Sequence, residues 1–204
     1  DLTRRRGVSA VIATPDLACL VPDHMGLAVA ASPMEVHDAI HRHLAETPDR
    51  LWTDFKTVIS PSARVHSTAV IPDLNVRILD GAEIMALAVI GERVVIGAET
   101  RLHSHSSVGA EAYEIVRGTI LGRRCEVLSG TVISSSAFAG STQIGDHVVL
   151  DGNVTVSHDS VIGDGTRVGG GSWIGGRVSI GRDVSVGPGC VVGNGLRIGN
   201  GAKL

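Results

Sequence analysis

Large aliphatic residues recur at every sixth position along most of this chain. Over the final third of the chain the period is unbroken. The next residue is usually glycine, and the residue four places on is small or β-branched except at Leu196. Chance does not keep such a register over so long a stretch, so the pattern predicts an internal structural repeat. The aliphatic positions of this run are Ile144, Leu150, Val156, Ile162, Val168, Ile174, Ile180, Val186, Val192, Ile198 and Leu204.

The same period occurs earlier in the chain with interruptions. A first run is followed by a slip of one residue, after which the spacing of six resumes, and a third short run precedes the regular part. The positions are Ile59, Val65 and Ile71, then Ile78, Ile84, Ile90, Ile96, Leu102 and Val108, then Leu121, Val127 and Ile133.

Each unit of six predicts a short strand followed by a turn. The aliphatic side chain points inward, the small residue fits where the interior narrows, and glycine is expected to relieve the backbone at the corner. Three units form one coil of 18 residues, and the coils stack as parallel strands. A sandwich would need period-two strands with irregular turns, and these are absent. The pattern therefore predicts an all-β fold, a parallel β-helix over residues 58–204.

Two breaks in the register predict inserted loops. Between Val108 and Leu121 the spacing exceeds two units by one residue, and this stretch contains Tyr113. Between Ile133 and Ile144 it falls one residue short, and Phe138 lies there. Loops on a solenoid are where sites are usually elaborated, although a tolerated surface bulge explains each break equally well.

Residues 1–57 lack the repeat and predict a small α/β domain. Residues 8–13 and 26–31 are expected to form short buried strands. Residues 32–44 predict a helix with one apolar stripe, which would pack on these strands. Its start has a serine N-cap, a proline at the first helical position and a capping-box glutamate, which are Ser32, Pro33 and Glu35.

Two histidines on this predicted helix, His37 and His41, are one turn apart. A metal site there is conceivable, but no third ligand is apparent nearby. We therefore expect surface histidines and assign no metal ligand in the chain.

Composition and charge exclude several classes of function. The chain has 26 glycines but only two tryptophans, two phenylalanines and one tyrosine, so its core must be aliphatic. The formal charge of −3 and the lack of a basic block beyond residues 4–6 argue against nucleic acid and membrane surfaces. No apolar stretch is long enough to span a bilayer.

Cysteine usage fits a reducing compartment. Cys19, Cys125 and Cys190 are far apart and odd in number, which argues against a disulfide framework and favours the cytoplasm. The chain begins with Asp1 rather than methionine and ends at an inward-facing Leu204. We expect natural sequence to be missing at both ends, so that the α/β domain is incomplete.

His158 is the strongest candidate for chemistry. It stands two places after Val156, where side chains project outward, and Gly176 stands at the same place one coil later. The stacking sets an imidazole beside a glycine amide that no side chain of its own shields. A general base next to such a donor is what acyl transfer needs, and histidine exchanges protons near physiological pH.

From spacing alone, a solvated histidine on the outer surface is the commoner situation. A catalytic His158 would also need a carboxylate to orient its ring. Asp151 and Asp159 are both candidates, and the spacing does not choose between them.

Several segments resemble the UDP-3-O-acylglucosamine N-acyltransferases of lipid A biosynthesis. The segment from Leu150 to Gly176, "LDGNVTVSHDSVIGDGTRVGGGSWIGG", is similar to the catalytic segment of that family. Upstream, "SVGAEAY" at 107–113 corresponds to an insertion loop of the family. Residues 8–17 with 27–40 resemble the later half of its uridine-binding domain, and residues 58–71 resemble the entry to its helix.

This resemblance implies a fold, a reaction and partners. The β-helix would be left-handed, and the chain would form a homotrimer with active sites between neighbouring helices. The acyl donor would be phosphopantetheine on acyl carrier protein, the acceptor a UDP-linked amino sugar, with no bound cofactor. By position, His158 would be the general base, the Gly176 N–H the oxyanion donor and Asp151 the partner of His158. We assign substrate contacts to Tyr113, Phe138 and Asp159.

Three other functions compete with this one. A sugar acetyltransferase that uses acetyl-CoA keeps the chemistry and changes the substrates. A metal-dependent hydratase of the γ-carbonic anhydrase type would need three converging histidines, for which His103, His105, His147 and His158 are available. A catalytically silent scaffold is the last alternative.

Overall fold

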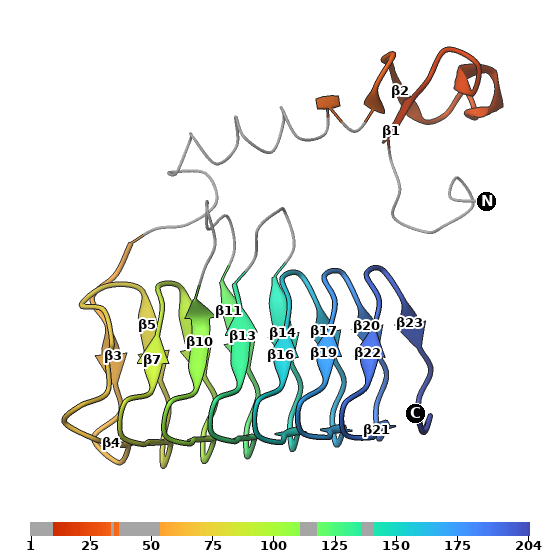
Figure 1. Cartoon of the computed structure of the whole chain (residues 1–204). Helices are drawn as coiled ribbons and strands as arrows, with labels where there is room; N and C mark the ends of the chain where they lie inside the picture. Colours follow the sequence, from red (N-terminus) through yellow and green to blue (C-terminus); the bar gives the residue numbers. More distant parts are fainter. Residues whose placement is uncertain (1–9, 34, 37–53, 111–117, 136–140) are drawn as a thin grey trace. The chain divides into compact units, whose positions relative to one another are not determined.

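The computed structural model describes residues 10–33, 35–36, 54–110, 118–135 and 141–204 (Figure 1). The chain divides into two compact units, residues 1–48 and residues 49–204. The second unit contains every strand of the repeat, from β3 onward. No helix among the described residues has the length and apolar character needed to cross a membrane.

The N-terminal unit contains two parallel strands and a short 3-10 turn. Strand β1 (Ala10–Ala13) pairs in parallel with β2 (Gly26–Val29), and η2 (Ala18–Leu20) lies between them. All four residues of β2 are exposed, so the prediction of two buried strands is wrong in this respect.

The predicted helix start is present in this unit. The backbone N–H of Glu35 donates to Ser32 Oγ at 3.4 Å, and that of Val36 donates to the Ser32 carbonyl oxygen at 3.3 Å. These bonds fit the predicted N-cap. The rest of the predicted helix, with His37 and His41, lies outside the described residues.

The second unit is a parallel β-helix with three faces, as the period predicts, and it is left-handed, as the resemblance implies. Face 1 has eight strands: β3 (Val58–Ile59), β5 (Val76–Ile78), β8 (Val94–Ile96), β11 (Thr119–Leu121), β14 (Thr142–Ile144), β17 (Val161–Ile162), β20 (Ser179–Ile180) and β23 (Arg197–Ile198). Face 2 has seven: β4 (Arg64–Val65), β6 (Glu83–Ile84), β9 (Arg101–Leu102), β12 (Glu126–Val127), β15 (Val149–Leu150), β18 (Arg167–Val168) and β21 (Ser185–Val186). Face 3 has six: β7 (Val89–Ile90), β10 (Ser107–Ala110), β13 (Val132–Ser134), β16 (Thr155–Val156), β19 (Trp173–Ile174) and β22 (Val191–Val192).

The chain visits the faces in the order 1, 2, 3, and each passage between faces makes a corner. We call these the 1–2, 2–3 and 3–1 corners. Strands of one face pair in parallel, and Val156 in β16 pairs with Ile174 in β19, 18 positions on. Residues that are 18 apart in the regular part therefore stack on the same face or corner.

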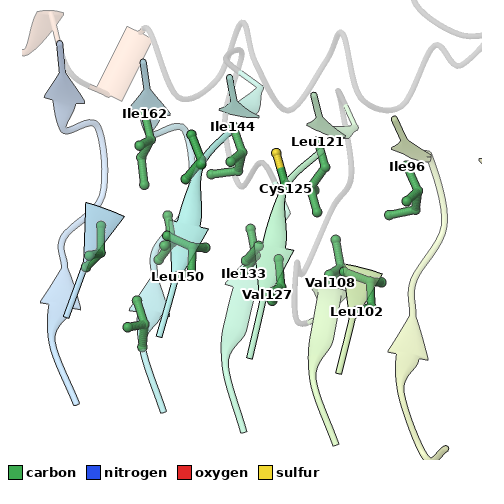
Figure 2. Packing of buried hydrophobic residues seen from close by; sticks show 14 of the residues in the cluster. Ile96, Leu102, Val108, Leu121, Cys125, Val127, Ile133, Ile144, Leu150 and Ile162 are labelled. Atoms are coloured by element: carbon green, nitrogen blue, oxygen red, sulfur yellow. The ribbon is translucent and has the colours of Figure 1, made fainter. Parts of the chain in front are cut away.

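The core is the column of inward aliphatic side chains (Figure 2). Figure 2 shows Ile144, Leu150 and Ile162 directed into the interior from β14, β15 and β17, and each is at most 2% exposed. Burial of apolar surface is the main driving force for folding. Here aliphatic side chains supply it, because the buried core of the described residues contains no aromatic side chain. The inward positions from Ile78 to Val192 are all buried, which confirms the predicted period.

The two ends of the β-helix differ from this pattern. Ile59 and Val65 in the first coil are exposed, and Leu204 at the other end is 51% exposed. They occupy inward positions of the repeat, but a terminal coil has a neighbouring coil on one side only among the described residues. An inward position in the repeat can therefore be exposed where a coil lies on one side of it only.

Contrary to the sequence prediction, the glycines that follow inward aliphatic residues do not relieve the backbone at the corner. Gly163, directly after an inward aliphatic residue, has no left-handed φ; a Cβ there would lie 2.6 Å from the carbonyl carbon of Gly181 in the next coil. The left-handed turn falls two places later, at positions such as Asn153 (φ 58°) and Gly165 (φ 68°). Glycine after the aliphatic residue thus permits the close approach of successive coils.

Buried hydroxyls at the small positions join one coil to the next. Thr166 Oγ1 donates to the carbonyl oxygen of Gly181 at 2.9 Å and accepts the backbone N–H of Val184 at 3.2 Å. Ser160 and Ser172 make the same pair of bonds to their own next coils. At these three core positions a polar side chain is stable because its hydroxyl both donates and accepts a hydrogen bond.

We expect Thr166→Val to lower the free energy of unfolding by about 1–3 kcal/mol, since it leaves two backbone groups without a partner. Thr166→Ser keeps the hydroxyl and loses one methyl group, so it should cost about 1 kcal/mol at most. Urea unfolding followed by circular dichroism measures both changes. Equal stability of Thr166→Val and the parent chain would contradict this account.

Candidate active site

His158 lies on the 3–1 corner, between β16 and β17, and its side chain is 32% exposed. Its ring covers Gly176, the residue one coil further along the same corner. A Cβ placed on Gly176 would lie 2.8 Å from both Nε2 and Cε1 of His158. The structure thus stacks the two residues as the period of 18 predicts, and only glycine leaves room for the ring in this position.

Asp159 holds the imidazole of His158. Its Oδ2 lies 3.0 Å from His158 Nδ1, and its side chain is only 6% exposed. Asp159 has a left-handed φ of 57°, and its backbone N–H donates to Thr142 Oγ1 at 3.0 Å, which fixes this turn. A carboxylate at Nδ1 selects the tautomer with the proton on that atom, so Nε2 becomes the basic nitrogen.

Of the two carboxylates that the sequence leaves open, the structure pairs Asp159 with His158 and places Asp151 elsewhere. Asp151 follows β15 and lies on the 2–3 corner, where its Oδ1 is 3.7 Å from Arg167 Nη1. Asp151 and His158 are seven residues apart, which is one repeat unit and one further residue. One repeat unit leads from one corner to the next, so the two residues lie on different corners. The assignment of Asp159 to substrate contact also changes, because its nearly buried carboxylate contacts the imidazole.

The amide of Gly176 is not the unshielded donor that the spacing predicts. Its N–H donates to Oδ1 of Asn194 at 2.9 Å, and Asn194 lies one further coil along the 3–1 corner. Sequence reasoning missed Asn194. Two signals could have found it: its spacing of 18 from Gly176, and the repeated Asp or Asn two places after an inward aliphatic, as at Asp146, Asp164 and Asn200.

Both interruptions of the repeat fall on the same corner as His158. Residues 111–117 connect β10 to β11, and residues 136–140 connect β13 to β14, so each leads from face 3 to face 1. These are the two coils that precede the coil of His158 along face 3. Tyr113 and Phe138 themselves lie outside the described residues, and their assignment to substrate contact stays a prediction.

Other reactive groups are unsuited to this site. Burial raises the pKa of the Cys125 thiol, whose Sγ donates to the Gly145 carbonyl oxygen at 3.0 Å, so it is protonated. His103 and His105 follow β9 on the 2–3 corner, whereas His147 follows β14 on the 1–2 corner. Within the described part of the chain, no three metal-ligating side chains come together.

Two segments match known repeat families. Residues 141–176, which include His158 and Gly176, match the family described as bacterial transferase hexapeptide (six repeats). Residues 104–135 match the hexapeptide repeat of succinyl-transferase.

The curated relatives are O-acyltransferases. The chain is 25% identical over 132 residues to the acyl-[acyl-carrier-protein]–UDP-N-acetylglucosamine O-acyltransferase of Rhizobium leguminosarum bv. trifolii (strain WSM2304), covering 53% of this chain and 48% of the relative. It is 26% identical over 130 residues to the protein of the same name from Rhizobium etli, covering 52% and 48%. The chain thus spans about half the length of these relatives.

Solved structures share the fold. UDP-N-acetylglucosamine acyltransferase of Arabidopsis superimposes with a TM-score of 0.51 at 19% identity, over 71% of this chain and 66% of that chain. The enzyme of the same name from Francisella novicida gives 0.51 at 22% identity, over 72% and 60%. At this identity the likeness concerns the β-helix alone.

We expect Gly176→Ala to displace the His158 ring, because the new methyl group would occupy its space. The ring resonances of His158 should shift in NMR spectra, and overpacking should cost about 1–3 kcal/mol of stability. Gly193→Ala is the matched control on the same corner, since a Cβ there would meet only Leu196 Cδ1, at 3.8 Å. Unchanged His158 resonances in Gly176→Ala would contradict the stacking.

Proposed function

We propose that this hexapeptide-repeat protein is an acyltransferase, which moves an acyl chain from the phosphopantetheine of acyl carrier protein to the amine of a UDP-linked amino sugar. The observation that carries this proposal is the stacked pair of His158 and Gly176, with Asp159 at Nδ1 of the imidazole. The matched transferase repeat spans this pair, and the resemblance of residues 150–176 to N-acyltransferases supports the choice of reaction.

In the proposed reaction His158 Nε2 accepts the proton of the attacking amine. The amine nitrogen forms a bond to the thioester carbonyl carbon, and the carbonyl oxygen becomes an oxyanion. Collapse of this intermediate breaks the C–S bond, and His158 returns the proton to the leaving thiolate. The products are an amide and a free phosphopantetheine thiol, so no further reactant is needed.

Asp159 stabilises the imidazolium that forms during this step and keeps the ring turned towards Gly176. The Gly176 N–H is the proposed donor to the oxyanion. This role requires Asn194 Oδ1 to leave the amide when the thioester carbonyl arrives, because the two oxygens compete for one hydrogen.

Transfer to a hydroxyl instead of an amine is the second candidate. The names of the Rhizobium relatives favour it, because they specify O-acyl transfer to UDP-N-acetylglucosamine from acyl carrier protein. The same residues serve both reactions, since His158 would take the proton of either nucleophile. Product analysis with UDP-N-acetylglucosamine and with a UDP-3-O-acylglucosamine as acceptors separates the two. Acetyl-CoA in place of the long-chain donor tests the sugar acetyltransferase alternative.

The proposal includes the predicted homotrimer and the predicted domain roles. Trp173 on β19 and Val191 on β22 are exposed apolar residues of face 3, next to the corner of His158, and they favour self-association of this face. Residues 1–57 remain assigned to a partial uridine-binding-like domain. Residues 58–204 remain assigned to the acyltransferase domain, in a cytoplasmic enzyme.

We expect His158→Gln to lower kcat for acyl transfer by about 10²–10⁴-fold, because the proposed general base is lost. The matched control is His103→Gln: its side chain is 30% exposed and lies 3.9 Å from a carboxylate, but on the 2–3 corner. Initial rates with acyl carrier protein thioester and UDP-linked amino sugar measure both. Undiminished transfer by His158→Gln would favour a silent scaffold or a site elsewhere.

We expect Asp159→Asn to lower acyl transfer at least about tenfold, because the imidazole loses the carboxylate that stabilises its charged form. Asparagine tolerates the left-handed backbone of this position, so the turn should be preserved. Asp151→Asn, at a corner without the imidazole, should leave the rate within about twofold. Equal rates for the two variants would remove Asp159 from the mechanism.

A further inference from the structure

The bond between Gly176 and Asn194 is the feature of the site that the proposed reaction leaves unexplained. An oxyanion donor should point into the place where the reacting carbonyl will lie, yet the Gly176 N–H is occupied by Asn194 Oδ1 at 2.9 Å. The amide belongs to a buried residue, whereas Asn194 is exposed. The side-chain oxygen therefore occupies the donor that the reacting carbonyl oxygen would need.

Comparable bonds elsewhere in the β-helix are structural. On the 1–2 corner, the backbone N–H of Arg182 donates to Asn200 Oδ1 at 2.9 Å, and that of Asp146 donates to Asp164 Oδ1 at 2.9 Å. The Arg123 N–H donates in the same way to Asp146 Oδ1, and this bond, together with the Arg123 side chain, lowers the pKa of Asp146. Asp and Asn both serve at this position, so holding a backbone N–H needs only an acceptor oxygen.

Asn194 differs from these residues in its surroundings. The amide that it holds belongs to the glycine under the His158 ring, so its carboxamide lies at the edge of the proposed reaction centre. A carboxamide carries an acceptor oxygen and two N–H donors on one planar group. A movement about its side-chain torsions that takes Oδ1 off the Gly176 N–H can therefore present a donor in place of an acceptor.

We propose that Asn194 is a second oxyanion donor, which covers the Gly176 N–H at rest and turns its amide nitrogen towards the same oxygen during the reaction. This inference rests on the proposed acyl transfer. The arriving thioester oxygen displaces Oδ1 from the Gly176 N–H. The carboxamide moves aside and rotates, so that Nδ2–H donates to the developing negative charge from beside it. Oxyanion holes commonly combine a backbone N–H with a side-chain amide in this way.

The chemistry of the resting bond also explains why the donor must rotate. Two N–H groups that point at one place repel each other when no oxygen lies between them. In the resting protein the carboxamide oxygen fills that place, so the Gly176 amide keeps a partner and no buried donor is left unsatisfied. Asn194 is exposed to solvent, and its Oδ1 packs against Gly175, which has no Cβ in the way.

Asn194→Asp tests the proposal, because aspartate can accept the Gly176 N–H but cannot donate to an oxyanion. We expect a melting temperature close to that of the parent chain and a fall in kcat of about 10²–10³-fold with little change in KM. Asn194→Ala should also lower kcat, because the second donor is lost even though the Gly176 N–H is freed. The matched controls are Asn200→Asp and Asn200→Ala, with the same bond on the 1–2 corner.

The assays use the whole chain with acyl carrier protein thioester and a UDP-linked amino sugar, and with CoA thioester as a second donor. Transfer by Asn194→Asp within twofold of the parent rate overturns the inference and leaves Asn194 a structural residue like Asn200. An equal loss of kcat in Asn200→Asp also overturns it, because the effect would then belong to the scaffold. A parent chain that transfers no acyl group from either donor overturns the proposed function, and this inference with it.

Discussion

The hydrogen bonds between successive coils set the geometry of this protein. The Ser157 N–H donates to the Ile174 carbonyl oxygen at 2.8 Å, and the Gly175 N–H donates to that of Val192 at 2.8 Å. Bonds of this length hold backbones of adjacent coils at one strand spacing all along the helix. The close approach explains the glycines after inward aliphatic residues, as at Gly163, and the buried hydroxyls that bridge coils at positions such as Thr166.

The candidate site is a direct product of this stacking. His158, Gly176 and Asn194 occupy equivalent places in three successive coils, so the strand spacing alone brings the imidazole, the glycine amide and the carboxamide together. No loop has to close to assemble them. The stacking of the imidazole on residue 176 requires glycine there, because any Cβ would take the space of the ring. The nearly buried Asp159 then sets which nitrogen of the ring is basic.

The corner of His158 is also where the repeat is least regular. Both inserted segments, 111–117 and 136–140, lead from face 3 to face 1, and they belong to the two coils before that of His158. A solenoid has many similar corners, so a site specific for one substrate needs a feature that the other corners lack. The inserted segments are such a feature. The same corner reuses a scaffold bond, since Asn194 holds Gly176 as Asn200 holds Arg182. The candidate site and the structural repeat thus share their residues.

The sequence by itself determined the fold and the stacking of His158 on Gly176, because a period of six with small fourth residues permits few other structures and places equivalent positions 18 residues apart. Corner arithmetic on the same period could also have excluded Asp151. Only the tertiary structure decided that Asp159 contacts the imidazole and that Asn194 occupies the Gly176 amide. These outcomes depend on the left-handed turn at Asp159 and on side-chain torsions. A period specifies which coil and corner a residue occupies, but the direction of its side chain follows from local dihedral angles and neighbouring coils.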